Sequence, residues 1–570
     1  MKLKKTILIL ILFTCLIFSI AGACAGDADG AGMNATDTDE RLSSIDDNQI
    51  IKENSDDTLG ATSTFQSLND EIDHASAGST ITLKNDYAYS NGDYPVQITK
   101  KIKINGNGKS LDGKGETRIL SIYSDAEISD LTIKNGKDDD KGISAIYINP
   151  NCKLTLKNCI IESNTGLRGA ILNNGELILT GCTIKDNSGN TTGAIYNTGA
   201  GQITLTNTII ERNTATGSSG AIYNIGKLTM TGGAISDNAG KHGGAILNTE
   251  DSELTLENVR IENNNATEYG GGILNQGIMT ITNSAFINNR ATSYGGAIFN
   301  NGNHETRITG SALKDNRASR GGAIVAYAGN IRIDKSNITG NIASYGGAIE
   351  NYVTLKITES RLENNGANYG GAIYNFNTLT IDNTYMGGNI ALGSGGAIYC
   401  NNESNTATIT YSTMENNNAG DSGGAIFTKK TLIIQHSTFT NNLAKEGGAI
   451  SNEGTLTITD SSLKNNNATT VGGAIRIVEG KTTISDTSME NNHAKDGGAL
   501  YISNGDVTVT SGTLKSNAAT EYGGAIYAIN SILKITGTGL TDNSAENGGA
   551  ILCVNTTTTV TGLTLENNAA

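Results

Sequence analysis

Carboxylates are the side chains of this sequence that come closest to a catalytic or metal-binding arrangement. Asp112, Asp130 and three consecutive aspartates at 138–140 stand among residues typical of turns. Grouped carboxylates can bind Ca²⁺, and a pair of them beside a sugar can cleave a glycosidic bond. Because no carboxylate recurs at one position of three successive repeats with an Arg or Lys base beside it, we expect these aspartates to be solvated turn residues.

Histidine and cysteine are the other candidates for chemistry. The five histidines, at positions 74, 242, 304, 436 and 493, share no spacing typical of metal ligands, so neither a metal nor another cofactor is expected. Cys159 and Cys182 each stand two residues before an isoleucine of the repeat, one repeat apart. They should therefore stack at about the distance between strands, close to that of a disulfide. The sequence leaves open whether they form a bridge or pack as two small apolar side chains.

A repeat centred on Gly-Ala-Ile must position all of these residues. It occurs sixteen times, from Gly169 to Gly549, at a mean spacing of about 25 residues, which is typical of solenoids. Each period also contains an alternating stretch, such as Leu-Thr-Ile-Thr at 456–459, and then an apolar residue with Asn three places later. Alternation with period two is typical of strands with one buried face. The sequence therefore predicts an all-β fold, a parallel β-helix with three strands per coil.

Equivalent residues of stacked coils should form ladders along the axis. The Ile of Gly-Ala-Ile is expected to point inward, and so is the Asn two places later, whose amide can then bond the Asn above and below. The paired glycines should supply positive φ or allow close approach of backbones. The predicted structural residues include Gly296, Ile298, Asn300, Gly371, Ile373, Asn375 and the third-element asparagines Asn289, Asn442 and Asn466.

Variation between coils is concentrated just before the paired glycines. Tyrosines stand there in some coils, while others have Ser, Lys, His or Val. The tyrosines are Tyr269, Tyr294, Tyr345, Tyr369 and Tyr522. Because the repeated residues belong to the core and the corners, specificity is expected to lie in what differs between coils.

The N-terminal part of the chain has another composition. Residues 1–23 combine three lysines, an uncharged apolar run and Ala-Gly-Ala, the parts of a secretory signal peptide, and Cys24 follows as a candidate for lipidation. No second run of that kind follows, so no membrane span is expected after signal removal. Residues 24–60 are rich in carboxylates and should form a disordered spacer.

The solenoid is expected to begin with a cap. Phe65, Leu68, Ile72 and Ala75 are spaced like one face of a short helix, which could cover the open end of the first coil. Residues 61–168 are thus predicted to hold the cap and irregular coils, and residues 169–570 the regular coils.

Gly-Gly-Ala-Ile and [Phe/Leu/Ile/Met]-x-x-Asn, repeated through 169–570, resemble the repeat of chlamydial polymorphic outer-membrane proteins. The segments 65–68, 77–83 and 104–108 resemble the opening of adhesin-like β-helix proteins of methanogenic archaea. The resemblance implies a right-handed β-helix at the cell surface, secreted to the cell envelope, that binds glycans or proteins of other cells without catalysis. The sequence stops in mid-repeat, so an open strand edge and end-to-end association are expected there.

Functions other than adhesion are also compatible with this fold. Pectin-degrading enzymes use the same fold, so a polysaccharide lyase or hydrolase is the first alternative. Outward Thr-x-Thr rows suggest ice binding, but residues such as Glu257 and Asp382 interrupt them. A purely structural surface-layer rod is a further alternative. The net charge of −15 argues against nucleic acid as a partner, because phosphate binding requires clustered Lys and Arg.

Overall fold

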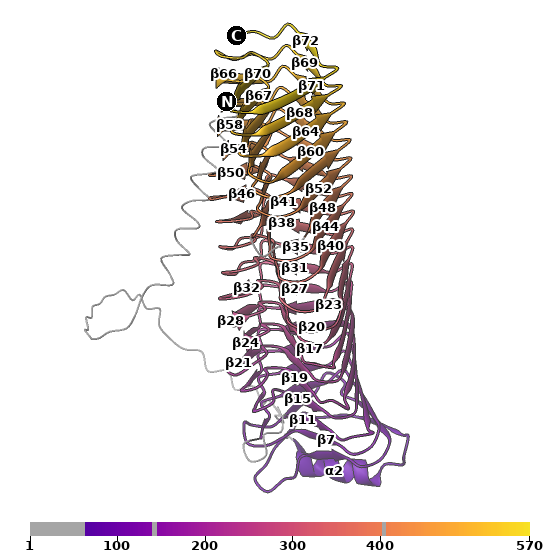
Figure 1. Ribbon diagram of the computed structural model, residues 1–570. Coiled ribbons are helices and arrows are strands. Elements are labelled where there is room, and N and C mark those ends of the chain that lie inside the picture. The colour runs from indigo at the N-terminus through magenta and orange to yellow at the C-terminus, as the bar shows by residue number, and fades with distance from the viewer. Residues whose placement is uncertain (1–62, 139–144, 402–405) are drawn as a thin grey trace, which may run out of the picture. The chain divides into compact units, whose positions relative to one another are not determined.

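The computed structural model describes residues 63–138, 145–401 and 406–570, and most of these lie in short parallel strands (Figure 1). The predicted signal peptide and acidic spacer lie outside the described residues. A typical coil consists of β33 (Ile298–Asn300), β34 (Thr306–Thr309) and β35 (Ala312–Lys314). Several coils add a short strand such as β32 (Arg290–Ala291).

Each strand pairs in parallel with its equivalent in the next coil. Ile298 of β33 lies opposite Ile324, and Ile308 of β34 lies opposite Ile333. The sixteen Gly-Ala-Ile strands, together with β4 (Val96–Ile98), β7 (Leu120–Ile122) and β11 (Ile146–Ile148) of the earlier coils, form one 19-stranded sheet. The second and third strands of the coils join in a 39-stranded sheet. The prediction of a parallel β-helix with three main strands per coil is confirmed.

The second and third strands of a coil meet at a corner made by one residue of positive φ. Asn283, with φ of 47°, separates β30 (Ile278–Thr282) from β31 (Ala285–Ile287). In β20 (Gln202–Glu211) and β23 (Lys227–Ser236) the strand continues through the corner without a break. This explains why the two strands belong to one sheet.

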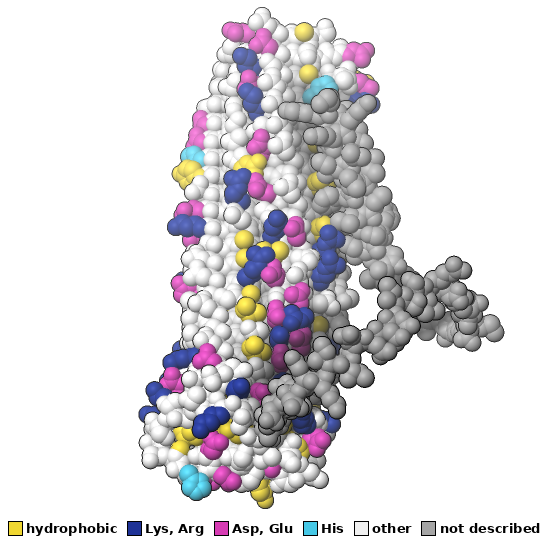
Figure 2. Space-filling model, turned by 180° about the vertical axis from the view of Figure 1, so that it is seen from behind, with side chains coloured by type: hydrophobic (Ala, Val, Ile, Leu, Met, Phe, Trp, Pro, Cys, Tyr) yellow, Lys and Arg dark blue, Asp and Glu magenta, His cyan; other side chains and the backbone are white. Residues whose placement is uncertain are grey.

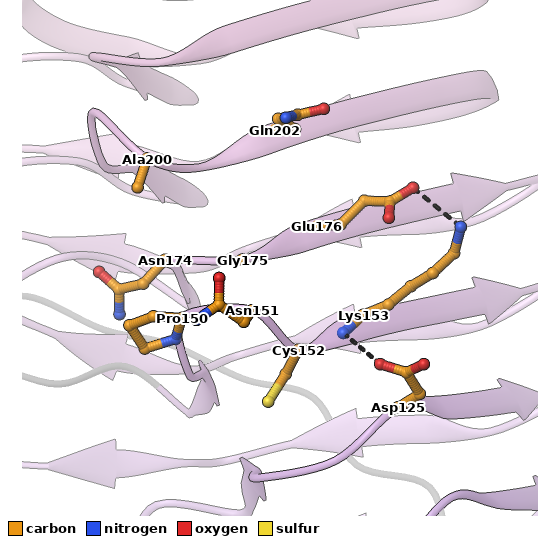
Figure 3. Close-up of a pocket in the computed structure, with 10 residues that line it drawn as sticks. All are labelled: Asp125, Pro150, Asn151, Cys152, Lys153, Asn174, Gly175, Glu176, Ala200 and Gln202. Carbon is orange, nitrogen blue, oxygen red and sulfur yellow. Dashed lines mark hydrogen bonds and ion pairs between the residues drawn. The ribbon is translucent and has the colours of Figure 1, made fainter.

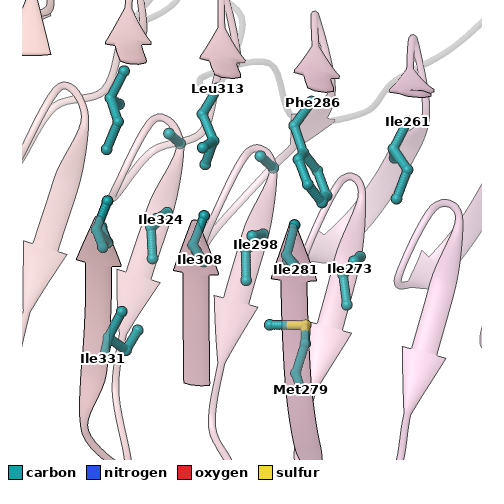
Figure 4. Packing of buried hydrophobic residues seen from close by; sticks show 14 of the residues in the cluster. Ile261, Ile273, Met279, Ile281, Phe286, Ile298, Ile308, Leu313, Ile324 and Ile331 are labelled. Carbon is teal, nitrogen blue, oxygen red and sulfur yellow. The ribbon is translucent and has the colours of Figure 1, made fainter. Parts of the chain in front are cut away.

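The core fills the space between the three strands of each coil. Ile298, Ile308 and Leu313, one from each strand of the coil β33–β35, are fully buried. In Figure 4, Ile273, Ile298 and Ile324 follow one another in a row, because equivalent residues stack from coil to coil. Burying such side chains contributes about 1.5–3 kcal/mol each relative to exposure.

The predicted helix is present as α2 (Phe65–His74), at the N-terminal end of the coils in Figure 1. It begins at Thr64, whose Oγ1 accepts a hydrogen bond from Ser67 N–H at 3.3 Å. Phe65, Leu68 and Ile72 are buried on the face that the sequence pattern indicated, so the helix covers apolar side chains of the first coils.

The paired glycines divide the two predicted roles between them. Gly295 has φ of 65°, where an L side chain is strained. A Cβ on Gly296 would collide with the carbonyl oxygen of Gly322 in the next coil. The same division recurs at Gly370 and Gly371.

Apolar side chains are exposed in the last strands, β70 (Ile551–Val554), β71 (Thr557–Thr561) and β72 (Thr564–Glu566). Val560 and Leu565 pair with the core residues Ile535 and Leu540 but are themselves exposed. End-to-end association at this edge stays a prediction.

Candidate binding face

Asparagine forms two hydrogen-bonded ladders inside the solenoid. The predicted ladder, from the Asn two places after Ile, is present from Asn173 to Asn300, with Nδ2 to Oδ1 distances of 2.7–2.8 Å. It is interrupted where Ala326 stands in the next coil, and one further pair joins Asn351 and Asn375. The Asn ladder that the sequence predicts is therefore confirmed, with interruptions.

The second ladder is longer. Its asparagines are visible in the sequence as the third element of the repeat, but their hydrogen bonding to one another was not predicted. It contains the third-element Asn of every coil from Asn164 to Asn568, joined by Nδ2 to Oδ1 bonds of 2.8–3.1 Å. Asn316, for example, also donates to the carbonyl oxygen of Phe286 at 3.0 Å. Asn289, Asn442 and Asn466 belong to this ladder. It satisfies buried amides and backbone groups, so it is a structural element.

A third ladder explains the two cysteines. At the corner between the second and third strands, the N–H of Ser284 donates to Ser311 Oγ, and the N–H of Ser311 donates to Ser336 Oγ, both at 3.1 Å. Cys159 and Cys182 occupy the same corner, and the N–H of Cys159 donates to Cys182 Sγ at 3.4 Å. Both are free thiols in the structure, and their bridging stays a prediction. The hydrogen bond with Cys182, together with burial, raises the pKa of the Cys159 thiol.

The candidate carboxylates lie in turns, as expected. Asp112 Oδ1 accepts hydrogen bonds from Lys114 N–H at 2.9 Å and Asn135 Nδ2 at 3.0 Å. Burial raises its pKa, but these bonds outweigh burial and hold the pKa below its ordinary value. Asp130 makes a corner with φ of 53°. The side chain of residue 138 and the whole of 139–140 lie outside the described residues.

A groove of about 360 Å³ lies beside β12 (Lys153–Lys157) and β16 (Glu176–Thr180), as Figure 3 shows. Lys153 Nζ forms an ion pair with Glu176 Oε1 at 2.8 Å, and its backbone N–H donates to Asp125 Oδ1 at 3.0 Å. The two carboxylates therefore have partners within the groove. Within the three described ranges, no His, Cys, Asp and Glu side chains form a group of three or more that could hold a metal ion.

Charged residues on the outer surface mostly pair across neighbouring coils. Lys227 with Glu253 and Lys464 with Glu490 are examples, both at 3.0 Å. In Figure 2, basic and acidic side chains lie next to one another along the rod, among mostly uncharged surface. The outward threonine row is interrupted, because Arg307 follows Thr280 in the pairing. This interruption disfavours a flat ice-binding face.

One part of the outer surface is aromatic. Eleven side chains of seven successive coils make an unbroken series of ring contacts, with centroid distances of 4.4–6.1 Å. We call this surface the aromatic band. Its members are Tyr269, Tyr294, Phe299, Tyr327, Tyr345, Tyr352, Tyr369, Tyr374, Phe376, Tyr399 and Phe427. They lie beside or on β29 (Ile273–Asn275), β33, β36 (Ile324–Ala326), β39 (Ile349–Asn351), β43 (Ile373–Asn375), β47 (Ile398–Cys400) and β51 (Ile426–Thr428).

The aromatic band combines side chains from three positions of the coil, each of which forms a column along the axis of the solenoid. Tyr269 and Tyr345 precede the paired glycines, Tyr374 stands between Ile and Asn, and Tyr327 and Tyr352 follow the first Asn position. The exposed fractions differ, because Tyr374 is 9% exposed, whereas Tyr369 is 40% and Tyr327 is 55% exposed. The inner rings are therefore packed as a layer on the sheet, and the outer ones are accessible.

An ion pair lies within the aromatic band. Glu350 is fully buried, and both of its carboxylate oxygens accept hydrogen bonds from Arg320 Nε, at 2.9 and 3.0 Å. The Tyr352 hydroxyl donates to the same carboxylate at 2.9 Å. The Arg320 guanidinium lies 5.1 Å from the ring centroid of Tyr345, so it continues the column of stacked rings. Burial raises the pKa of Glu350, although these hydrogen bonds lower it.

The histidines do not converge. His242 stacks on Tyr269 at the edge of the aromatic band, and burial lowers its pKa. His436 stacks on Tyr411 on another sheet. Both histidines therefore contribute to stacking with a tyrosine ring.

In the described part of the chain, no helix is both long and apolar enough to cross a membrane. A family model described as the right-handed β-helix region matches residues 144–317. The Chlamydia polymorphic membrane protein repeat matches residues 411–429 and 436–453, which suggests a location at the outer membrane or cell surface. No curated protein matches the chain. The chain is thus a right-handed parallel β-helix that carries repeats similar to those of Chlamydia polymorphic membrane proteins, as its sequence indicated.

Proposed function

We propose that this protein is a non-catalytic, surface-displayed adhesin that binds glycans or proteins of other cells through the aromatic band. The observation that carries the proposal is the unbroken series of eleven aromatic rings on the outside of a solenoid whose core is already filled. Large contiguous apolar patches on a soluble surface mark interaction sites. Tyr, Phe and Arg are also the residues enriched in the cores of protein interfaces.

The repeat supports display on a surface. Its match is to a polymorphic membrane protein repeat, and the N-terminal residues have the pattern of a secretory signal. A stack of coils whose outer charges are mostly paired suits a scaffold that holds the aromatic band away from the cell.

The arrangement of the carboxylates favours adhesion over catalysis. The carboxylates of the groove in Figure 3 are engaged by Lys153, and Asp112 is held by Lys114 and Asn135. A lyase or hydrolase needs carboxylates poised toward a substrate, and Asp112, Asp125 and Glu176, each held by a partner in the chain, do not supply them.

Purified protein incubated with a panel of immobilised polysaccharides and with whole cells tests this proposal. We expect retention on at least one surface with no soluble product, with or without Ca²⁺. Release of unsaturated or reducing sugar in the presence of Ca²⁺ would overturn the adhesin proposal and support a lyase or hydrolase. Retention on no surface at all would also count against it.

A further inference from the structure

We propose that the aromatic band pairs with the aromatic band of a second copy of this chain. This inference rests on the proposed function, because it names the partner of the same surface. It predicts an adhesin that binds a second copy of itself.

Ring orientation is the first argument. Tyr374, Tyr399 and Phe427 stack at centroid distances of 4.9 Å, with interplanar angles of 9° and 19°. Tyr352 and Phe376 stack at 4.4 Å and 10°. Stacked rings cover one another's faces. The 40% exposed Tyr369 stacks on Tyr345 at 6.0 Å and 14°, so ring edges and hydroxyls are what this column offers to a partner. A sugar that stacks on an aromatic side chain needs a free face, whereas ring edges pack favourably against other aromatic rings.

Charge is the second argument. The chain has a net charge of −15, so two copies repel each other over much of their surface. The aromatic band is an exception. Its buried Glu350 is paired with Arg320, and Lys429, which lies 5.7 Å from the Phe427 ring, is paired with Glu453. Two bands can therefore meet without placing unpaired like charges opposite each other.

Size is the third argument. The seven strands that carry the aromatic band, at about 4.8 Å per step, extend it over about 30 Å along the axis. With three columns of side chains across, it offers about 600 Å² per copy, and two copies would bury about 1,200 Å², the lower end of specific interfaces. A twofold axis uses the same patch on both copies, which is the commonest way in which identical chains associate. The expected dissociation constant is therefore micromolar.

Sedimentation velocity of the full chain between about 1 and 100 μM tests this inference, because that range brackets micromolar affinity. We expect a monomer–dimer equilibrium. The double variant Tyr327→Lys/Tyr369→Lys puts like charges on the accessible rings of both copies and should weaken the dimer at least about tenfold. The matched control is Tyr94→Lys/Tyr411→Lys, since these tyrosines are 67% and 62% exposed and lie outside the aromatic band. The control should dimerise like the unchanged chain.

Circular dichroism of each variant verifies that the coils are intact before association is compared. A monomer at every concentration, or equal association of the band variant and the control, would overturn this inference. The second result would point to another contact, such as the C-terminal edge. A monomeric protein that still binds cells through the band would leave the proposed adhesin function standing. A dimer that binds no cell or glycan would support this inference and contradict that function.

Discussion

The long asparagine ladder and the aromatic band follow the same coils, one on the inside and one on the outside, yet they differ in how much they vary. The ladder keeps Asn in every coil from Asn164 to Asn568. The outer position between Ile and the first Asn changes from Phe299 to Val325 to Glu350 within three coils. An interior amide needs a complementary amide above and below it, whereas the side chain between Ile and the first Asn lies outside the core and can be Phe, Val or Glu, each with its own neighbours, such as Arg320 for Glu350. Structure is therefore concentrated in the constant positions, and we expect specificity in the variable ones.

The largest loss of stability is expected inside the solenoid, on substitution of Asn341. This side chain accepts from Asn316 Nδ2 at 3.0 Å and donates to Leu313 O at 2.9 Å and Asn365 Oδ1 at 3.0 Å. Asn341→Leu should destabilise the surrounding coils by about 3–5 kcal/mol, because several buried polar groups lose a partner.

Native-state hydrogen exchange of the amides in residues 316–365 measures this effect, since a solenoid can open locally. The matched control is Asn337→Ala, an exposed Asn of β38 (Asn337–Thr339) in the same coil, which should change local stability by less than about 0.5 kcal/mol. Equal protection in the two variants would show that the ladder is dispensable.

A smaller loss is expected at the paired glycines. Gly296→Ala places a Cβ against the backbone of Gly322 and Arg317, so we expect a loss of about 2–3 kcal/mol. Gly539→Ala is the control, because nothing lies within 4 Å of a Cβ there. Urea denaturation followed by circular dichroism should separate the two variants, and indistinguishable curves would contradict the close-approach explanation.

Removing the ion pair of the aromatic band should cost less stability than these changes. Glu350→Ala leaves the Arg320 guanidinium among rings without its partner, and breaking a fully buried pair costs about 3–5 kcal/mol. Arg320 is partly exposed and can turn toward water, so about 1–3 kcal/mol is expected here. Glu363→Ala, which breaks the exposed pair with Arg361, should cost at most about 1 kcal/mol. The urea midpoints of the two variants test this order, and a larger loss for Glu363→Ala would refute it.

The pH dependence of the same pair follows from the raised pKa of Glu350. A carboxyl whose folded-state pKa is raised binds its proton more tightly in the folded chain. Its contribution to stability is present below the ordinary pKa of 4.5 and is lost as the pH rises through the folded-state value. The free energy of unfolding of the unchanged chain minus that of Glu350→Gln should therefore fall as the pH rises through this window. A rise of this quantity with pH would contradict the role of burial.

The smallest change in stability is expected on substitution of the two cysteines. Ser311 and Ser336 show that hydroxyls fill the same corner, so Cys159→Ser/Cys182→Ser should change the free energy of unfolding by less than about 1 kcal/mol if both thiols are free. Removing a disulfide would instead cost about 2–5 kcal/mol. Mass spectrometry after alkylation without reductant distinguishes free thiols from the bridge independently.

The fold was predictable because two simple periods determine it. Alternation of Leu and Thr at 456–459 indicates strands, and recurrence about every 25 residues indicates stacked coils. The first Asn ladder was predictable for the same reason, since a residue two places after a buried Ile shares its face. The distance of each cysteine from Ile161 or Ile184 predicts that the two cysteines stack in one column. The corner ladder to which they belong was not predictable, because its position varies among Ser, Thr, Cys, Val and Gly.

The aromatic band could not be assembled from the sequence. The tyrosines before the paired glycines, such as Tyr345, were visible as a variable position. Tyr327, Tyr352 and Tyr374 belong to other columns, and only the folded corners bring these columns into contact. The Arg320–Glu350 pair spans two coils and two columns, so no spacing within one repeat reveals it.

Retention of matched tyrosine variants on the cell or glycan surface that binds the unchanged chain tests the central claim most directly. Tyr327→Ser/Tyr369→Ser should abolish retention while changing the free energy of unfolding by no more than about 2 kcal/mol, because the side chains are 55% and 40% exposed. Tyr94→Ser/Tyr411→Ser should leave retention unchanged. If both double variants bind like the unchanged chain, the aromatic band is not the binding face and the division between constant interior and functional exterior fails.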